Sequence, residues 1–421
     1  MKPLRTTWYK HWNNTIQFSS IINSYNVRDF CSALNRFHSG DSDKLSLDFS
    51  KVVRAYPNGM LPVIASIELL RRKGISVYVR LPNRSETRKL FRNVNWAHYL
   101  SPSQFEKSES HHERHLVSRF FSDEKEQKNV VDDFMEVVIR NMVLPRDIIS
   151  GLEWSINEIT DNVLNHSNSE IGGIVQATTY SKEGIIAFAV ADSGRGILNS
   201  LQEGIPTLRT DIQAIGEAVK AGVTRNSQVG QGNGLAGSLK VTTMTGGSFE
   251  ITSGIGRVLS TLEATTKSPR RDWQYYQGTV VCGQVGIQED FAINKALEFG
   301  TGIEYTPVDI IEMQYEIEDK NCLFLKMRTE TTGFGTRRSG LQIRTKIMNL
   351  IHAEPTYPLI IDWEGVPVIS SSFADEVVGK LFLKLGAIAF SARIRNVGME
   401  QLIKGLLDKA VAQRLTQAND G

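Results

Sequence analysis

Residues 155–237 are the part of the chain that best indicates its fold and function, because three short motifs follow one another there in a fixed order. They are NEITDN at residues 157–162, DSGRG at residues 192–196 and GQGNG at residues 230–234. Apolar residues spaced three and four apart predict that the first motif lies on a helix ending near His166. The second motif follows an apolar strand pattern and the third precedes a helical pattern. Together, a helical carboxylate and amide, a glycine turn and a glycine-rich loop predict a nucleotide-binding site.

The first motif carries two polar residues of suitable chemistry. Glu158 and Asn162 are four residues apart, so a helix would place them on one face, beside the apolar stripe. An amide oxygen can bind Mg²⁺, which takes its other ligands from water and phosphate oxygens. A neighbouring glutamate can align or deprotonate the nucleophile that attacks a γ-phosphate. We therefore expect Glu158 to act as catalytic base and Asn162 as magnesium ligand, although this motif alone would more often be the polar face of an exposed helix.

The other two motifs supply groups that could hold the rest of a nucleotide. Asp192 ends a strand, where its carboxylate could accept a hydrogen bond from the exocyclic amine of adenine, while Gly194 and Gly196 let the backbone approach a planar ring. The third motif precedes a helix, whose free amides can bind phosphates and whose glycines would permit a lid. The candidate lid glycines are Gly230, Gly232 and Gly234. Each motif alone is common in ordinary loops, so their shared order carries the prediction.

These motifs resemble the N box and the two glycine boxes of the GHKL ATPases, which include gyrase, MutL, heat-shock chaperones, histidine kinases and anti-sigma-factor kinases. The resemblance covers about residues 115–287, including GG at 246–247 and GTV at 278–280. It implies a Bergerat-fold α/β sandwich that binds ATP and Mg²⁺, with Thr279 supporting the adenine contact of Asp192. The implied site residues are Glu158, Asn162, Asp192, Gly194, Gly196, Gly230, Gly232, Gly234 and Thr279. The sequence has no GxxxxGK[ST] run, so a Walker-type site is excluded.

The rest of the chain is predicted to form α/β modules on both sides of this ATPase domain. We expect an N-terminal α/β domain at residues 1–110, the ATPase domain at 111–287, a linker leading into a strand at 288–319 and a C-terminal α/β domain at 320–421. The predicted helices are residues 61–72, 86–96, 124–141, 145–166, 212–221, 235–245, 342–350, 371–385 and 399–415. The predicted strands are residues 45–49, 75–79, 174–180, 185–190, 322–327, 359–362 and 392–397, with further strands around Ser248, Val258 and Thr279.

The C-terminal domain resembles a STAS module, through IDWEG at residues 361–365 and SSSF at residues 370–373. The N-terminal domain is a more distant STAS-like match, and LSLDF at residues 45–49 parallels LIIDW at residues 359–363; duplication and convergence are both open. In partner switching, a GHKL kinase phosphorylates a STAS serine at the start of this helix. The candidate phosphoacceptors are therefore Ser370, Ser371 and Ser372, although we favour a helix cap for this cluster.

Composition limits the class of protein. Hydrophobic residues make up 41% and charged residues 22% of the 421 residues, as in soluble globular proteins. A net charge of +2 does not indicate dedicated nucleic-acid binding or attraction to anionic lipid. The three cysteines, Cys31, Cys282 and Cys322, fit neither a disulfide framework nor a zinc site. With no signal-peptide core and no long apolar run, we expect a cytoplasmic protein that does not cross a membrane.

Three functions are consistent with these observations. We favour an ATP-dependent conformational switch with slow hydrolysis, acting in intracellular signalling or regulation. The alternatives are a serine kinase of the partner-switching type that acts on a STAS-like domain, and a non-catalytic, nucleotide-sensing interaction protein. In each case we expect a protein partner, of the STAS type or another regulatory type, while a homodimer stays open.

Overall fold

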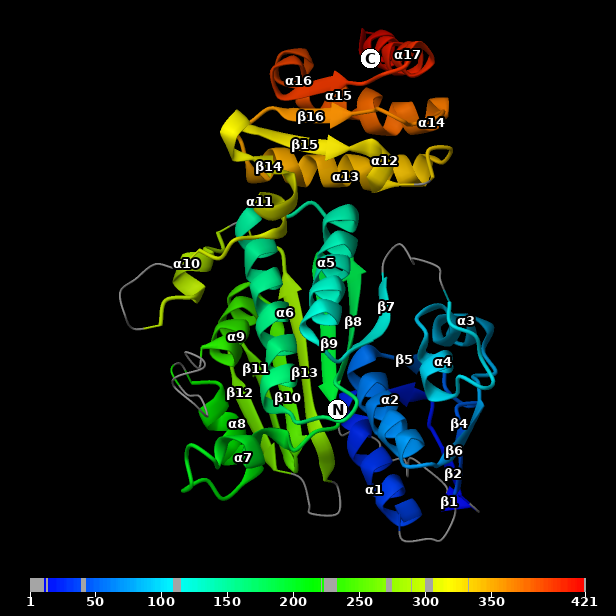
Figure 1. The fold of residues 1–421 in the computed structure, drawn as a ribbon, viewed down its shortest axis with the longest axis vertical. Helices are drawn as coiled ribbons and strands as arrows, with labels where there is room; N and C mark the ends of the chain where they lie inside the picture. Colours follow the sequence, from blue (N-terminus) through cyan, green and yellow to red (C-terminus); the bar gives the residue numbers. More distant parts are fainter. Residues whose placement is uncertain are drawn as a thin grey trace. The chain divides into compact units, whose positions relative to one another are not determined.

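The computed structural model describes residues 11–12, 14–38, 43–108, 115–220, 222, 233–269, 275–288, 290–299, 306–331 and 333–419 (Figure 1). The chain is a mixed α/β protein with several sheets, and it divides into two units that are described separately. The first unit comprises Met1–Val137 and Gly151–Thr306, and the second comprises Val138–Ser150 and Pro307–Gly421. The boundary predicted near residue 110 lies within the first unit.

An antiparallel sheet of seven strands, in the order β12-β11-β10-β13-β9-β8-β7, forms the centre of the first unit. Its strands are β7 (His115–Phe121), β8 (Gly173–Tyr180), β9 (Ile185–Asp192), β10 (Ser248–Gly254), β11 (Gly256–Thr261), β12 (Thr265–Pro269) and β13 (Tyr276–Gly286). The predicted hairpin of β8 and β9 is confirmed. One face of the sheet is covered by α5 (Glu124–Asn141), α6 (Arg146–His166) and α9 (Gly234–Met244) (Figure 1). Phe134 of α5 meets Phe188 of β9 edge to face, so this side of β9 points toward the helices.

The opposite face of this sheet is covered by the N-terminal segment. Its helices α1 (Val27–His38) and α2 (Pro57–Arg72) belong to one buried cluster with Ile174, Ala191 and Val280 of the sheet. Because both faces are covered, every residue of β8 except Tyr180 is buried, which is unusual for an antiparallel sheet. The N-terminal segment and the seven-stranded sheet therefore share a hydrophobic core.

A second sheet in the N-terminal segment has the order β1-β2-β4-β6. Its strands are β1 (His11–Trp12), β2 (Thr15–Gln17), β4 (Lys44–Asp48) and β6 (Ser76–Arg80), and the short strands β3 (Ile21–Ile22) and β5 (Arg54–Ala55) pair beside it. Strands β2, β4 and β6 are parallel, so the predicted βαβ unit is confirmed. Helices α3 (Ser85–Asn93) and α4 (Trp96–Leu100) follow, and Trp96 Nε1 donates to Gln176 Oε1 of β8 at 2.7 Å.

The second unit contains a four-stranded sheet in the order β14-β15-β16-β17. Its strands are β14 (Glu316–Ile317), β15 (Cys322–Lys326), β16 (Leu359–Asp362) and β17 (Ile394–Val397). Its helices are α11 (Ile310–Tyr315), α12 (Met327–Glu330), α13 (Arg337–Ala353), α14 (Ser371–Ala374), α15 (Lys380–Leu385), α16 (Ala387–Arg393) and α17 (Gln401–Asn419). As in the N-terminal sheet, one antiparallel edge strand is followed by three parallel strands.

The two four-stranded sheets also share local hydrogen bonds. Asp48 accepts from the backbone N–H of Ser50 at 2.8 Å, and Asp362 accepts from that of Glu364 at 3.0 Å. In both sheets the residue after this aspartate donates its N–H to the last residue of the next strand, at 2.9 Å and 3.0 Å. The two sheets therefore share these local contacts as well as their strand order.

Several elements differ from the sequence-based expectations. The predicted linker at residues 288–319 contains α10 (Ile293–Ala296) and α11. The predicted helix at residues 371–385 is present, but its middle turn, Asp375–Gly379, is π-helical. Strand β12 and helix α16 were not predicted, and β17 begins at Ile394 instead of Ala392. Helix α16 was missed because its apolar residues do not form a buried face, so the sequence lacks a clear helical period there. Ile388, for example, is 88% exposed.

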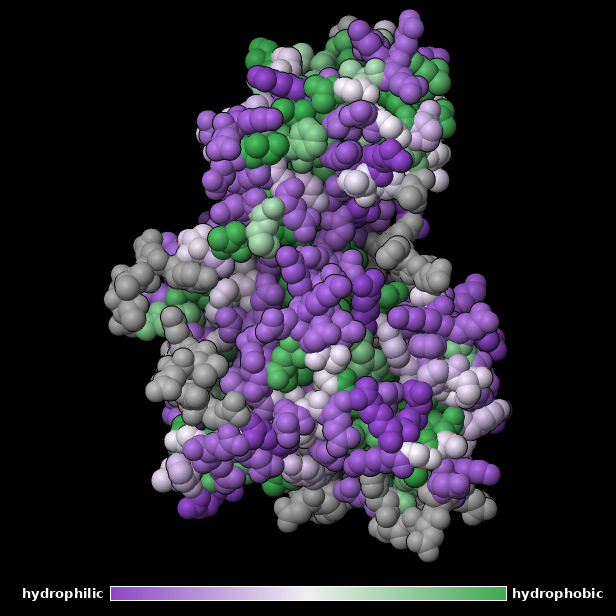
Figure 2. Space-filling model, viewed as in Figure 1, coloured by the Kyte–Doolittle hydropathy of each residue, from purple (hydrophilic) through white to green (hydrophobic). Residues whose placement is uncertain are grey.

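The surface is largely polar in the view of Figure 2, and its hydrophobic residues form small separate areas. All three cysteines are free, and Cys31 and Cys322 are buried. Over the described part of the chain, no helix is long and apolar enough to cross a lipid bilayer.

The segment that joins α5 to α6 is held in the second unit by one buried side chain, Asn349 of α13. Its amide nitrogen donates to the carbonyls of Ile139 (2.7 Å) and Met142 (2.8 Å), and its amide oxygen accepts from the N–H of Leu144 (2.7 Å). Asn349 is 1% exposed, so water cannot replace these contacts.

We expect Asn349→Ala to lower the free energy of unfolding of the second unit by about 3 kcal/mol, because three buried backbone groups lose their partner. Chemical denaturation would measure the loss. Asn14→Ala, at a half-buried position of the first unit, is the control and should leave the unfolding transition of the second unit unchanged. A change below about 1 kcal/mol for Asn349→Ala would contradict the assigned role.

Candidate functional site

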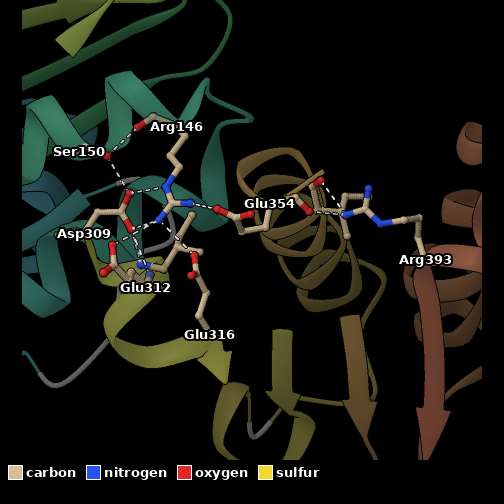
Figure 3. A network of polar contacts seen from close by, with 9 residues as sticks. Arg146, Ser150, Asp309, Glu312, Glu316, Glu354 and Arg393 are labelled. Atoms are coloured by element: carbon tan, nitrogen blue, oxygen red, sulfur yellow. Dashed lines mark hydrogen bonds and ion pairs between the residues drawn. The ribbon is translucent and has the colours of Figure 1, made fainter. Parts of the chain in front are cut away.

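Helix α6 begins with Arg146, whose guanidinium lies among four carboxylates of the second unit (Figure 3). It is 3.0 Å from Asp309, 3.6 Å from Glu312 and 3.1 Å from Glu316, and it also pairs with Glu354. Burial raises the pKa of Glu316, and the nearby carboxylates add to this effect while Arg146 opposes it. The network fixes the first turn of α6, the helix that carries the first motif.

The first motif lies on α6 as predicted. The apolar stripe is buried at each expected position, namely Ile149, Leu152, Ile156, Ile159 and Val163. Glu158 and Asn162 are half-buried beside this stripe. Glu158 also contacts Gly234, the first residue of α9, so closely that a Cβ atom at Gly234 would collide with the carboxylate. The structure therefore brings together the first motif and the end of the third.

Glu158 is held in an environment that disfavours its charge. Burial raises its pKa to about 7, with a further contribution from the like charge of Asp161. A carboxyl group with this pKa exchanges its proton near neutral pH, which is suitable for a general base. Such shifts are common at functional sites, although ion-pair networks produce them as well.

Asn162, one helical turn after Glu158, has unused hydrogen-bonding capacity. Its side-chain nitrogen is buried and has no hydrogen-bond partner among the described residues. A buried polar group without a partner costs free energy unless a ligand or water completes it. Asn162 is therefore a candidate for contact with a ligand, and its oxygen is of the type that Mg²⁺ prefers.

Asp192 ends β9 and is 3% exposed. Its carboxylate accepts a hydrogen bond from the backbone N–H of Gly194 at 2.8 Å and another from the backbone of Thr279. Burial raises its pKa to about 7, although these two hydrogen bonds oppose the shift. The carboxylate is thus fixed in direction, weakly solvated and able to bind a donor group of a ligand.

The turn that carries Asp192 packs against the end of α6. Arg195 donates its backbone N–H to the carbonyl of Ser167 at 2.8 Å and its Nε to that of His166 at 2.9 Å. Gly194 lies so close to Ser167 that any Cβ atom would collide with its carbonyl oxygen, and Gly196 starts α7 (Gly196–Leu201). The second motif therefore contacts the helix of the first motif at one end, while the third contacts it at Glu158.

Ser253 was not singled out from the sequence, yet it ties these parts together. Its hydroxyl accepts from the N–H of Ile197 at 2.9 Å, donates to the carbonyl of Gly278 at 3.1 Å and lies 3.3 Å from Thr279 Oγ1. It is fully buried. No local pattern around Ser253 marks this role, because all three partners are distant in sequence.

The remaining predicted residues have separate positions. Gly230 and Gly232 lie outside the described residues. Ser370 accepts from the N–H of Phe373 at 3.1 Å, so it is a helix cap, as favoured from the sequence. Ser371 is exposed in the first turn, and Ser372 lies with its hydroxyl 3.0 Å from that of Ser370. These three serines belong to the second unit.

Comparison of this chain with protein-family models, with curated proteins and with solved structures found no significant match. The functional interpretation therefore depends on the residues and their geometry.

Proposed function

We propose that the first unit binds ATP with Mg²⁺ and hydrolyses it slowly, as a GHKL ATPase of the Bergerat fold. The observation that carries this proposal is that all three motifs meet at the second half of α6. Glu158 contacts the start of α9, and the Asp192 turn contacts the end of α6. These contacts join segments that are far apart in sequence, at the helix that carries both Glu158 and Asn162.

In this proposal Asp192 accepts a hydrogen bond from the exocyclic amine of adenine, and the N–H of Thr279 keeps its carboxylate in place. Gly194 and Gly196 allow the base to approach, and Gly234 begins a helix whose N-terminal amides would face phosphate. Gly230 and Gly232 would belong to the lid.

Asn162 would bind Mg²⁺ through its amide oxygen. Within the described residues, no group of three or more His, Cys, Asp or Glu side chains could hold a metal by itself. A magnesium ion here would thus take most of its ligands from phosphate and water, as it does in many nucleotide sites. Glu158 would then align the attacking water and accept its proton.

We further propose that the two flanking α/β parts are STAS-like modules and that the protein is a cytoplasmic regulatory switch with a protein partner. The shared strand order of the two four-stranded sheets supports a common origin of these modules. Helix α6 runs without a break from Arg146 to His166 and carries the first motif in its second half.

A thermal-shift and turnover assay on the full chain tests the proposal. Mg-ATP should raise the melting temperature, since a ligand at 100 times its Kd stabilises by about 2.7 kcal/mol, and phosphate should be released slowly. EDTA should abolish turnover. No shift at millimolar ATP would overturn ATP binding, and phosphate found on Ser371 by mass spectrometry would instead support the kinase alternative.

Turnover at saturating ATP should depend on pH. Glu158 acts as a base only when deprotonated, and its pKa is about 7. The rate should therefore be constant above about pH 8 and fall about tenfold per pH unit well below pH 7. Discontinuous assays of released phosphate between pH 5.5 and 9 would measure the turnover rate as a function of pH. A flat profile, or a rate that rises on acidification, would contradict Glu158 as the base.

A further inference from the structure

Tyr276, at the start of β13, connects the N-terminal segment to the turn that carries Asp192. Its hydroxyl donates to the backbone carbonyl of Asp192 at 2.7 Å, and the residue is 1% exposed. Burial, together with the nearby Asp192, raises the pKa of the phenol well above 10, so the hydroxyl stays a donor at physiological pH. The ring lies in the buried cluster formed largely by the N-terminal segment, in which Cys31 of α1 is one of its neighbours.

A bulge in β13 places Tyr276 in this position. Tyr276 pairs with Gly254 of β10 while Thr279 pairs with Ser253, so the register shifts between them. Gly278, inside the bulge, has a φ of 111° and approaches the Asp192 carbonyl so closely that a side chain could not fit. Bulges commonly redirect side chains next to active sites. Here the bulge directs one hydroxyl and one backbone N–H toward Asp192.

Further polar contacts fix the N-terminal segment to the same part of the sheet. Ser24, just before α1, donates to the buried carboxylate of Glu250 on β10 at 3.1 Å. Glu250 also pairs with Arg257 of β11 at 2.6 Å, and the Arg257 guanidinium lies 4.4 Å from the ring centre of Tyr25. The N-terminal segment is thus fixed to β10 and β11, beside β13, the strand that carries Tyr276.

We propose that Tyr276 is a positioning residue for the adenine contact, through which the N-terminal helices α1 and α2 set the selectivity of the site for adenine over other purines. This inference rests on the proposed function. Because coupling between sites is reciprocal, adenine nucleotides should also strengthen the docking of α1 and α2 on the sheet. The N-terminal segment then acts as part of the nucleotide site without touching the nucleotide.

Tyr276→Phe in the full chain tests this proposal, because it removes the hydroxyl and keeps the ring. The Kd values for ATP and ITP are measured, since hypoxanthine lacks the exocyclic amine that Asp192 would bind. The wild type should prefer ATP. In Tyr276→Phe, the Kd for ATP should rise about three- to tenfold, as expected for one hydrogen bond, while the Kd for ITP changes less than about twofold. Tyr99→Phe, in the same N-terminal segment and packed on Phe120, is the matched control and should keep the wild-type ratio.

Hydrogen–deuterium exchange, measured on the wild type and on Tyr276→Phe, gives a second readout. ATP should slow exchange in α1 and α2 of the wild type more than ITP does, and this difference should shrink in Tyr276→Phe. If the wild type binds ATP but Tyr276→Phe keeps the wild-type ATP to ITP ratio, or ATP leaves α1 and α2 unchanged in the wild type, the inference is overturned and the proposed function stands. If the wild type binds no ATP at all, the proposed function itself fails.

Discussion

Replacing Glu158 with glutamine is expected to lower the rate of ATP hydrolysis by about 10²- to 10⁴-fold, the usual contribution of a general base. Glutamine keeps the shape of the side chain beside Gly234 but cannot accept the proton of the attacking water. The affinity for ATP should change less than about threefold, because the role proposed for Glu158 is on the nucleophile and not on the bound nucleotide. Single-turnover phosphate release and equilibrium ATP titration would separate the two effects.

Asp161→Asn is the matched control for Glu158→Gln. Asp161 is exposed on the same helix, and its charge adds to the raised pKa of Glu158. Removing that charge should therefore lower the pKa of Glu158 and move the midpoint of the pH profile to lower pH, with little loss of maximal turnover. Wild-type turnover in Glu158→Gln would show that another group, or none, accepts the proton.

The second large effect is expected for Asp192→Asn, which should weaken ATP binding by about 10- to 100-fold, the range for a hydrogen bond to a charged group. The carboxylate already accepts hydrogen bonds from Gly194 and Thr279, and its remaining capacity would receive the adenine amine. An asparagine has only one acceptor oxygen, and its NH₂ group would oppose one of these donors. Calorimetric titration with ATP would measure the loss.

Asp48→Asn provides a matched control for this substitution. Asp48 also ends a strand, is 9% exposed and accepts the N–H of the residue two positions later, but it lies in the N-terminal sheet. It should remove a comparable contact between an aspartate and the backbone at a strand end and leave ATP affinity unchanged. Equal losses of affinity in both variants would mean that Asp192 acts only by maintaining the fold.

The raised pKa of Asp192 also has a defined effect on stability. Its ordinary value is 3.8 and its value in the folded, nucleotide-free protein is about 7, so the folded state holds the proton more tightly than the unfolded chain. The contribution of Asp192 to the stability of the folded state is therefore fully present below about pH 4. It is lost as the pH rises through about 7. A bound donor such as an amine would offset that loss, because it stabilises the ionised carboxylate.

Local periodicity was sufficient to predict much of the secondary structure. The stripe from Ile149 to Val163 has the 3.6-residue period of a helix, and the two apolar runs around the turn at residues 181–184 form the predicted hairpin of β8 and β9. These elements follow from contacts between residues near one another in sequence. Strand β12 was not predicted, because its sequence, TTKSP, lacks the apolar alternation of a core strand. The strand lies at the edge of the sheet and is mostly exposed.

Within the site, the sequence by itself determined which residues have suitable chemistry: Glu158, Asn162, Asp192 and their glycines stand in motifs that can be recognised without a structure. Only the tertiary structure decided that Glu158 meets the start of α9, that the Asp192 turn packs on the end of α6, and that Ser253 and Tyr276 hold that turn. The physical reason is that these contacts join residues far apart in the chain. Their free energy depends on strand register, a bulge and burial on both sides of one sheet, none of which is written in any short stretch of sequence.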